Sequence, residues 1–336
     1  MGTLIQKTSR CAVIGHGSWA TAITKVLTMN EPSVCWYVRN QDVLDSLRTE
    51  GHNCRYLPDV EFDMSRIHLT DDVNETVEWA DIVFLVTPAP YLKCYLTGLQ
   101  VPLKDKMVVS AIKGIIPGEN QFVTDYLKQQ YGLAEAQLCC ISGPTHAEEV
   151  GHGRLTYMTF ACSNIGNARV VGEKLKTPFI KVNCLRDMHY MEHSSVLKNI
   201  YSVMVGMAMG LGYGDNFIAV LVSNCIKEMY FLLDPQSVTD LTRFDPSNFF
   251  GDLLVSCYSS HSRNRQLGML IGRGNTVKTA LNEMTMVAEG YFASAMLPSL
   301  TKGQRIHLPI AETAYQVLHQ DVPARKAMKK LEEMLT

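Results

Sequence analysis

The sequence has no excess of either charge, no long apolar run and no repeated or low-complexity segment. Its 31 Lys and Arg residues against 33 Asp and Glu residues give a formal net charge of -2, so it lacks the basic surplus typical of nucleic-acid-binding proteins. The longest apolar stretch, residues 200–211, is shorter than the ~20 residues of a membrane span and contains Gly206 and Gly210. We therefore expect neither a nucleic-acid partner nor a membrane span.

Paired cysteines and metal-binding motifs are also absent from the sequence. The ten cysteines are scattered without a C-x-x-C pair, and there is no H-E-x-x-H motif, so a metal site has no support. Several cysteines, such as Cys11, Cys35 and Cys139, lie in apolar runs and are typical of buried thiols in a reducing compartment. The first ten residues lack the apolar segment of a secretory signal. We expect a cytoplasmic protein without a metal ion.

A glycine-containing turn near the N-terminus is the most informative feature that is present. The apolar run 11–14 breaks at Gly15 and Gly17, and helical spacing follows from Trp19 onward. In such a turn Gly15 permits the sharp bend, Gly17 lets a pyrophosphate approach bare backbone, and the small Ala20 lets helix and strand pack closely. The pattern G-x-G-x-x-A is common by itself, so its context has to support it.

The next strand-like run, residues 34–38, supplies that context, because it follows at the distance that a βαβ unit requires. Arg39 stands at its end. An acidic residue there binds the ribose 2′-hydroxyl of NAD, whereas an arginine can bind the 2′-phosphate of NADP. The sequence allows NADPH and leaves the choice between the two cofactors open.

Strand-like and helix-like segments alternate through the first half of the 336-residue chain. This alternation predicts a mostly parallel sheet with helices on both faces, a Rossmann-like dinucleotide-binding domain over residues 1–187. The expected strands are 11–14, 34–38, 67–70, 82–87, 107–111, 137–141, 158–162 and 179–182.

The pattern changes after residue 187. Segments of helical length dominate the remainder, which predicts an all-helical domain over residues 188–336. Asp215-Asn216 is the candidate N-cap of the second expected helix, and Pro235 is a candidate stop after it. The expected helices are 188–209, 217–233, 252–257, 263–271, 277–287, 311–318 and 323–335.

Two lysines are candidates for chemistry. Lys113 follows a strand at the edge where ligands bind in α/β sheets, where its ammonium can donate to an oxyanion or a phosphate. Lys198 lies among apolar residues with helical spacing, where desolvation would lower its pKa and favour proton exchange with a substrate oxygen. The alternatives are a solvated lysine in a turn for Lys113 and an ammonium that reaches water for Lys198.

A polar group in the helical half suggests an anion site. Asp252 begins the mostly apolar segment 252–257, and Ser262, Arg263 and Asn264 follow after four intervening residues. Arginine offers two parallel donors to a phosphate, serine and asparagine add neutral donors, and an aspartate can orient a neighbouring ammonium. A solvated polar surface is the alternative.

The sequence resembles the NAD(P)-dependent glycerol-3-phosphate dehydrogenase family, and it is particularly similar to the bacterial biosynthetic type. The resemblance extends over nearly the whole chain, and the joint order of its motifs is specific. These motifs are G-H-G-S-W-A-T-A at Gly15, Y-L-P-D-V at Tyr56, A-I-K-G at Ala111, S-G-P-T-H-A-E-E at Ser142, L-K-N at Leu197, G-Y-G-D-N at Gly212, G-D-L-L-V-S-C at Gly251, S-R-N-R at Ser262 and A-E-G-Y at Ala288.

The resemblance implies a role for individual residues. Lys198 would donate and accept the proton, with Asp252 beside it and Lys113 touching both cofactor and substrate. Besides the glycine turn, the implied cofactor contacts are Ser18, Trp19, Arg39, Lys113, Ala147, Arg263, Val287 and Glu289. The implied substrate contacts are Lys113, Gly143, Thr145, Lys198, Asp252, Ser262, Arg263 and Asn264, the last three holding the phosphate.

Several positions depart from the family pattern. His16 replaces a small residue, Ala20 stands where glycine is common after an aromatic residue, Ser256 replaces threonine, and Ile218 replaces a basic residue of several relatives. None of these changes removes a proposed chemical group. They add to the open choice between NAD and NADP.

The resemblance implies reversible reduction of dihydroxyacetone phosphate to sn-glycerol 3-phosphate by NAD(P)H, which supplies glycerophospholipid synthesis, and it implies a homodimer. Two alternatives stay open. One is a dehydrogenase of the same two-domain architecture that acts on a 3-hydroxy acid or a sugar nucleotide. The other is a cofactor-binding or redox-sensing protein without enzymatic activity.

Overall fold

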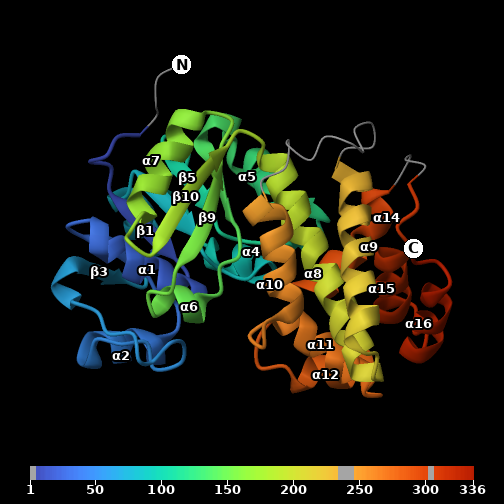
Figure 1. The fold of residues 1–336 in the computed structure, drawn as a ribbon. Helices are drawn as coiled ribbons and strands as arrows, with labels where there is room; N and C mark the ends of the chain where they lie inside the picture. The colour runs from blue at the N-terminus through green and yellow to red at the C-terminus, as the bar shows by residue number, and fades with distance from the viewer. Residues whose placement is uncertain (1–4, 234–245, 302–305) are drawn as a thin grey trace. The chain divides into compact units, whose positions relative to one another are not determined.

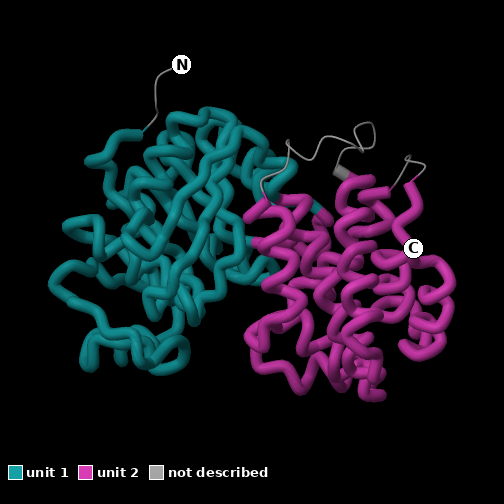
Figure 2. Tube along the Cα trace, in the orientation of Figure 1, with its two compact units in different colours: residues 1–112, 121–191 teal, residues 113–120, 192–336 magenta. Residues whose placement is uncertain are grey.

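The computed structural model describes residues 5–233, 246–301 and 306–336, and the chain divides into two compact units (Figures 1 and 2). The sheet unit comprises Met1–Ile112 and Gln121–Met191, and the helical unit comprises Lys113–Asn120 and Glu192–Thr336. The division of the chain at residues 187 and 188 stays a prediction.

Eight strands form one sheet in the described part of the sheet unit. In spatial order they run β10, β9, β8, β5, β4, β1, β2, β3, and neighbouring strands are parallel except β8 and β9. The eight strands predicted from the sequence are confirmed within a few residues at each end. They are β1 (Cys11–Ile14), β2 (Val34–Tyr37), β3 (Ile67–Thr70), β4 (Ile82–Leu85), β5 (Met107–Ser110), β8 (Leu138–Ser142), β9 (Thr156–Ala161) and β10 (Ile180–Leu185).

This order reverses direction at β1, which lies between β2 and β4. The carboxyl ends of these parallel strands lie at one edge of the sheet, and the reversal makes that edge the expected ligand site of a doubly wound fold. Every residue of β1, β2, β4 and β5 is buried. Helices must therefore cover both faces of the sheet there. The helices of the sheet unit are α1 (Ser18–Asn30), α2 (Gln41–Glu50), α3 (Val73–Trp79), α4 (Leu92–Tyr95), α5 (Val123–Tyr131), α6 (Ala147–Gly151) and α7 (Ile165–Leu175).

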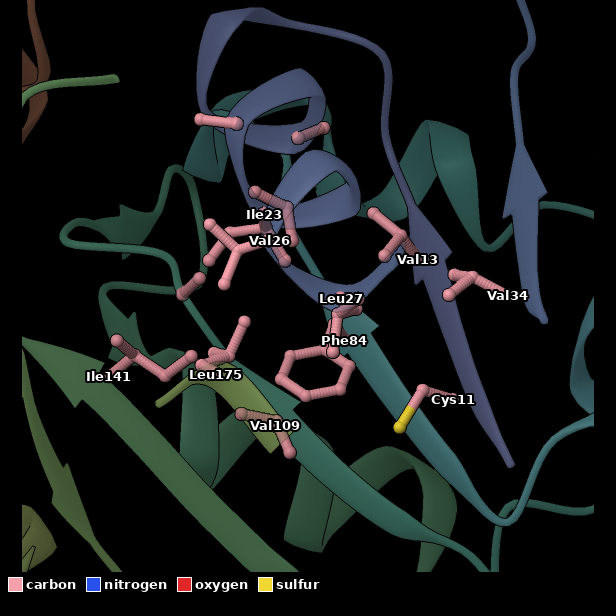
Figure 3. Packing of buried hydrophobic residues seen from close by; sticks show 14 of the residues in the cluster. Cys11, Val13, Ile23, Val26, Leu27, Val34, Phe84, Val109, Ile141 and Leu175 are labelled. Carbon is pink, nitrogen blue, oxygen red and sulfur yellow. The ribbon is translucent and has the colours of Figure 1, made fainter. Parts of the chain in front are cut away.

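Helix α1 is fixed to the sheet by a stripe of apolar side chains. Ile23, Val26 and Leu27 lie on one side of α1 and have no exposed surface. They belong to the same buried cluster as Val13 of β1 and Phe84 of β4 (Figure 3). Burial of each such side chain contributes about 1.5–3 kcal/mol, so the stripe holds the start of α1 in place beside the glycine turn.

The helical unit contains two long helices and several shorter ones in its described part. Most of the predicted helices are confirmed, while Pro235 lies outside the described residues. The described helices are α8 (Met188–Leu211), α9 (Asp215–Leu233), α10 (Asp252–Tyr258), α11 (Arg263–Gly272), α12 (Val277–Glu283), α13 (Glu289–Ala295), α14 (Leu297–Leu300), α15 (Pro309–His319) and α16 (Ala324–Glu332), with a π-helical turn, Ser247–Gly251, before α10.

Helices α8 and α11 approach each other backbone to backbone. A Cβ atom at Gly206 would lie 2.0 Å from the Arg265 carbonyl oxygen, and one at Gly268 would lie 1.9 Å from the Val203 carbonyl oxygen. The glycines that interrupt the apolar stretch of α8 therefore permit this close contact. The contact holds α11 against the C-terminal half of α8.

The elements expected from the sequence were incomplete in two respects. The helix predicted over 277–287 ends at Glu283, and a separate helix, α13, begins at Glu289. The break allows α13 to pack directly on α8, because a Cβ atom at Gly290 would lie 2.4 Å from the Asn199 carbonyl oxygen. The pattern also missed α14 and two short strands, β6 (Ile115–Ile116) in the helical unit and β7 (Gln121–Phe122) in the sheet unit.

Within the three described ranges, none of the helices combines the length and apolar character that a membrane crossing requires.

Candidate active site

The first part of the candidate site is the turn between β1 and α1. Gly15 follows β1 with a φ of +137°, and a Cβ atom there would lie 2.1 Å from the Val86 carbonyl oxygen. Its own carbonyl accepts a hydrogen bond of 2.7 Å from the indole of Trp36. Both the backbone conformation and the lack of space therefore require glycine at this position.

The N-terminus of α1 is open to an anion. Gly17 is its N-cap, no side chain of the described residues caps the helix, and a Cβ atom at Gly17 would meet nothing within 4 Å. Ser18 begins the helix and is buried, and Trp19 is half-buried against the core. The unpaired N–H groups and the helix dipole at this end favour a phosphate group.

A buried hydroxyl lies beside the same turn. Thr87, two residues beyond β4, is 7% exposed, and in the described part of the chain its Oγ1 has no hydrogen-bond partner. Its methyl carbon would be 3.4 Å from a Cβ atom at Gly15. Because an unsatisfied buried hydroxyl is costly, a bound molecule at the turn would supply a fitting partner. Together with the open helix end, this fits a bound dinucleotide.

Alanine substitutions at the two glycines separate folding from binding. We expect Gly15→Ala to lower the free energy of unfolding by about 2–4 kcal/mol, because its Cβ atom collides with backbone at a left-handed φ. In Gly17→Ala the methyl group enters open space at a φ of -75°, so the free energy of unfolding should change by less than about 1 kcal/mol. The methyl group would obstruct a pyrophosphate, and dinucleotide affinity should fall about tenfold or more.

Chemical denaturation and fluorescence titration with NADPH measure the two effects. Unchanged NADPH affinity in folded Gly17→Ala would contradict the placement of the pyrophosphate at this turn.

The remaining predicted residues of the sheet unit lie near the ends of two strands. Arg39, just beyond β2, is exposed, and its guanidinium carbon lies 4.9 Å from the centre of the Tyr95 ring. Gly143 follows β8 with a φ of +117°, and the Thr145 hydroxyl donates to its carbonyl at 3.2 Å. Ala147 is buried at the start of α6, a helix that packs against α1.

The second part of the candidate site is a buried ion cluster in the helical unit. Lys198 of α8 donates to Asp252 Oδ1 at 2.6 Å and to the Ser256 hydroxyl at 3.0 Å, both on α10. Lys113 donates to Asp252 Oδ2 at 3.0 Å. The exposed fractions of the Lys113, Lys198 and Asp252 side chains are 17%, 7% and 2%. The solvated alternatives for both lysines are therefore wrong.

Two ammonium groups share one carboxylate in this cluster. Burial lowers the pKa of Lys113 to about 8, and repulsion by the charge of Lys198 lowers it as well. Attraction by the charge of Asp252 opposes both effects and raises this pKa. Burial acts to raise the pKa of Asp252, but the charges and hydrogen bonds of both lysines outweigh it and hold that pKa below its usual value. Asp252 is thus ionised, and the cluster holds ammonium donors away from bulk water.

Asparagine side chains connect this cluster to α11 and α13. Asn199 donates to the Lys113 carbonyl at 2.6 Å, and its own amide oxygen accepts from Asn264 at 2.9 Å. The Asn264 oxygen in turn accepts from the Gly290 N–H at 2.8 Å. The interpretation of single residues missed Asn199 and Gly290, although both lie in the quoted motifs L-K-N and A-E-G-Y.

The residues predicted to bind the substrate phosphate share the N-terminal turn of α11. Ser262 is its N-cap and accepts from the Arg265 N–H at 3.3 Å, Arg263 is its half-buried first residue, and Asn264 is buried. Val287 and Glu289 are half-buried at the start of α13, which packs against α11. The structure thus brings Lys113, Lys198 and Asp252 into direct contact and links them through Asn264 to this helix end.

A doubly wound sheet with a glycine turn at an uncapped helix N-terminus, together with a helical unit that holds buried ammonium groups, is typical of a two-domain dinucleotide-dependent dehydrogenase. Comparison with known proteins agrees with that class. The family models described as NAD-dependent glycerol-3-phosphate dehydrogenase N-terminus and C-terminus match residues 10–168 and 187–329. The chain belongs to this family.

Individual relatives support the assignment over the full length. The chain is 35% identical to a glycerol-3-phosphate dehydrogenase [NAD(P)+] of Exiguobacterium over 327 residues, 95% of this chain and 94% of the relative. It is 33% identical to the enzyme of the same name from Agathobacter rectalis, with 96% and 95% covered. The crystal structure of glycerol-3-phosphate dehydrogenase from Coxiella burnetii has the same fold, with a TM-score of 0.87, 24% identity, and 98% and 100% of the chains covered.

Proposed function

We propose that the chain catalyses the reversible reduction of dihydroxyacetone phosphate to sn-glycerol 3-phosphate with NAD(P)H. The observation that carries the proposal is the Lys198 ammonium, which is buried and held by Asp252 at 2.6 Å and by Ser256 at 3.0 Å. Membership of the family supports the choice of substrate and cofactor.

In this reaction NAD(P)H, when bound, supplies a hydride to the C2 carbonyl carbon. Lys198 supplies the proton to the carbonyl oxygen, so that ketone, hydride and proton together give the secondary alcohol. Asp252 orients the ammonium and stabilises its charge, and Ser256 accepts a second hydrogen bond from it. In the reverse direction the neutral amine of Lys198 accepts the hydroxyl proton.

The phosphate of the substrate is proposed to bind at the start of α11. Ser262, Arg263 and Asn264 offer donors there, and the helix dipole adds positive potential. The Asn264 amide has two N–H bonds, and its hydrogen bond to Asn199 uses one of them. Binding energy from this remote group orients the carbonyl for reaction.

The other predicted contacts complete the proposal. We assign Lys113, Gly143 and Thr145 to the substrate. We assign the following residues to the dinucleotide: Gly15, Gly17, Ser18, Trp19, Arg39, Lys113, Ala147, Arg263, Val287 and Glu289.

Removal of one guanidinium tests the phosphate site. We expect Arg263→Ala to raise the KM for dihydroxyacetone phosphate about 10- to 100-fold, because the substrate phosphate would lose its charged hydrogen bonds to the guanidinium. Arg273→Ala, at an exposed arginine beyond the other end of α11, is the matched control and should leave KM unchanged. Steady-state kinetics with both variants measure the effect. A normal KM in Arg263→Ala would favour a dehydrogenase for a substrate without this phosphate.

The pKa of Lys113 predicts a dependence on pH. Its ammonium is charged below a pKa of about 8 and neutral above it, so the attraction to the substrate dianion is present at lower pH and lost as pH rises. We expect kcat/KM to fall by up to about tenfold per pH unit above that pKa. In Lys113→Arg, whose guanidinium keeps its charge, the alkaline decrease should vanish. If kcat/KM of Lys113→Arg falls at alkaline pH as it does in the wild type, a titrating group other than Lys113 causes the decrease.

A spectrophotometric assay tests the function as a whole. We expect addition of dihydroxyacetone phosphate to oxidise NADH or NADPH, each followed separately, whereas unphosphorylated dihydroxyacetone should react far more slowly. Binding of NADPH without oxidation would indicate a cofactor-binding protein. Oxidation of NADH or NADPH by a 3-keto acid, the oxidised form of a 3-hydroxy acid, instead of by dihydroxyacetone phosphate would indicate another dehydrogenase.

We also propose a homodimer in the cytoplasm that supplies glycerophospholipid synthesis. The apolar composition of the helical half and the family resemblance support the dimer. Sedimentation equilibrium should give twice the chain mass, and a monomer at all concentrations would contradict this part of the proposal.

A further inference from the structure

Arg39 occupies the position after β2 that meets the adenosine ribose in doubly wound folds. Its guanidinium carbon lies 4.9 Å from the centre of the Tyr95 ring, and its Nη1 donates to the Cys94 carbonyl at 3.4 Å. In the part of the chain that the structure describes, no carboxylate forms an ion pair with it. The guanidinium is therefore held in place while its charge is not neutralised.

Tyr95 is itself fixed from three sides. It is the last residue of α4 and is 6% exposed. Its ring packs edge to face against Tyr37, the last residue of β2, with the ring centres 6.1 Å apart. Its hydroxyl is hydrogen-bonded to His16 Nδ1 at 2.8 Å. The tyrosine thus connects the ribose position after β2 to the glycine turn after β1.

His16, the departure from the family pattern in that turn, is suited to this contact. Burial, with the nearby charges of Arg39 and Arg55, lowers the pKa of His16 to about 4. The ring is therefore neutral near pH 7 and adds no repulsion to Arg39. Its backbone carbonyl accepts from Asn53 at 2.9 Å, which also fixes the turn.

We propose that Tyr95 is a positioning residue that holds Arg39 for the 2′-phosphate of NADP(H), so that this chain binds NADPH more tightly than NADH. The inference rests on the proposed function only for the identity of the cofactor. A guanidinium stacked on an aromatic ring keeps its N–H donors in the plane and available to a phosphate. An arginine side chain that is free to move in solvent loses conformational entropy when it binds a phosphate. Because Tyr95 already orients Arg39, part of this entropy cost is absent on binding.

Direct binding of the two cofactors to the full chain tests the proposal without any turnover. Wild-type protein should bind NADPH at least about tenfold more tightly than NADH. Arg39→Ala should remove this preference. Tyr95→Leu, which removes the ring, should reduce it about fivefold or more while NADH affinity changes less than about twofold. Tyr95→Phe keeps the ring and loses only the bond to His16, so the preference should persist.

The double variant separates positioning from a general structural role. If Tyr95 acts through Arg39, Tyr95→Leu will have no further effect on NADPH affinity in an Arg39→Ala background. A merely structural role would weaken both cofactors equally in both backgrounds. Tyr95→Met fills a similar volume without an aromatic face and replaces Tyr95→Leu in the design if that variant does not fold.

Equal affinity of the wild-type protein for NADH and NADPH would overturn the inference, as would an unchanged preference in folded Tyr95→Leu or Tyr95→Met. The outcome is independent of the proposed reaction. NADPH preference without reduction of dihydroxyacetone phosphate would refute the proposed function alone, and reduction without the preference would refute this inference alone.

Discussion

Replacement of Lys198 with alanine is expected to lower kcat for dihydroxyacetone phosphate by about 10³-fold or more. The substitution removes the proposed proton donor, and water has no comparably oriented replacement. The predicted contacts of the glycine turn lie in the sheet unit, so the dissociation constant for NADPH should change less than about twofold. Stopped-flow turnover and fluorescence titration measure the two quantities.

A control variant shows whether the loss of activity is specific to Lys198 or follows the removal of any lysine. Lys227 is an exposed lysine on α9 whose ammonium lies 3.1 Å from the Thr336 hydroxyl, and Lys227→Ala should turn over at the wild-type rate. Added primary amines small enough to enter the cavity left by Lys198→Ala should restore part of the activity. Near-normal kcat in Lys198→Ala would remove the proton-transfer role.

Replacement of Asp252 with alanine is expected to destabilise the protein as well as inactivate it. The variant leaves two buried ammonium groups without their shared carboxylate, since both Lys113 and Lys198 donate to Asp252. Removal of one partner from a buried ion pair costs about 3–5 kcal/mol, so the midpoint of denaturation should shift strongly. Urea denaturation of the wild type and the variant measures the loss.

A second substitution tests the cause of that loss. Adding Lys198→Met to Asp252→Ala removes one unpaired charge and should restore part of the free energy of unfolding, although activity stays absent. If Lys198→Met instead lowers the free energy of unfolding of the Asp252→Ala variant further, by as much as replacing a buried lysine costs by itself, the charge explanation is wrong.

The sheet was predictable from the sequence because its strands carry a local signal. Buried strands such as β1 and β4 are continuous apolar runs, and the glycines after β1 mark the turn into α1. The break between Glu283 and Glu289 was not predictable, because it follows from the contact of α13 with α8 rather than from local spacing.

The ion cluster shows a different limit of local patterns. Lys113 and Asp252 are 139 positions apart, and Lys198 and Asp252 are 54 apart. Taken alone, each lysine has an ordinary solvated interpretation, and only the fold brings the three groups together. The resemblance to a family pointed to these residues, whereas the contact of Tyr95 with His16 and Arg39 had no signal in the motifs.

Isotope transfer tests the central claim most directly. NAD(P)H carrying deuterium at both positions of C4 is incubated with the enzyme and dihydroxyacetone phosphate, and the product is examined by NMR. We predict glycerol 3-phosphate with one deuterium at C2 and none at C1 or C3, because the hydride goes to the carbonyl carbon while the proton on oxygen comes from the protein and exchanges with water. Oxidation of the cofactor without deuterium at C2, or no oxidation at all, would contradict the account.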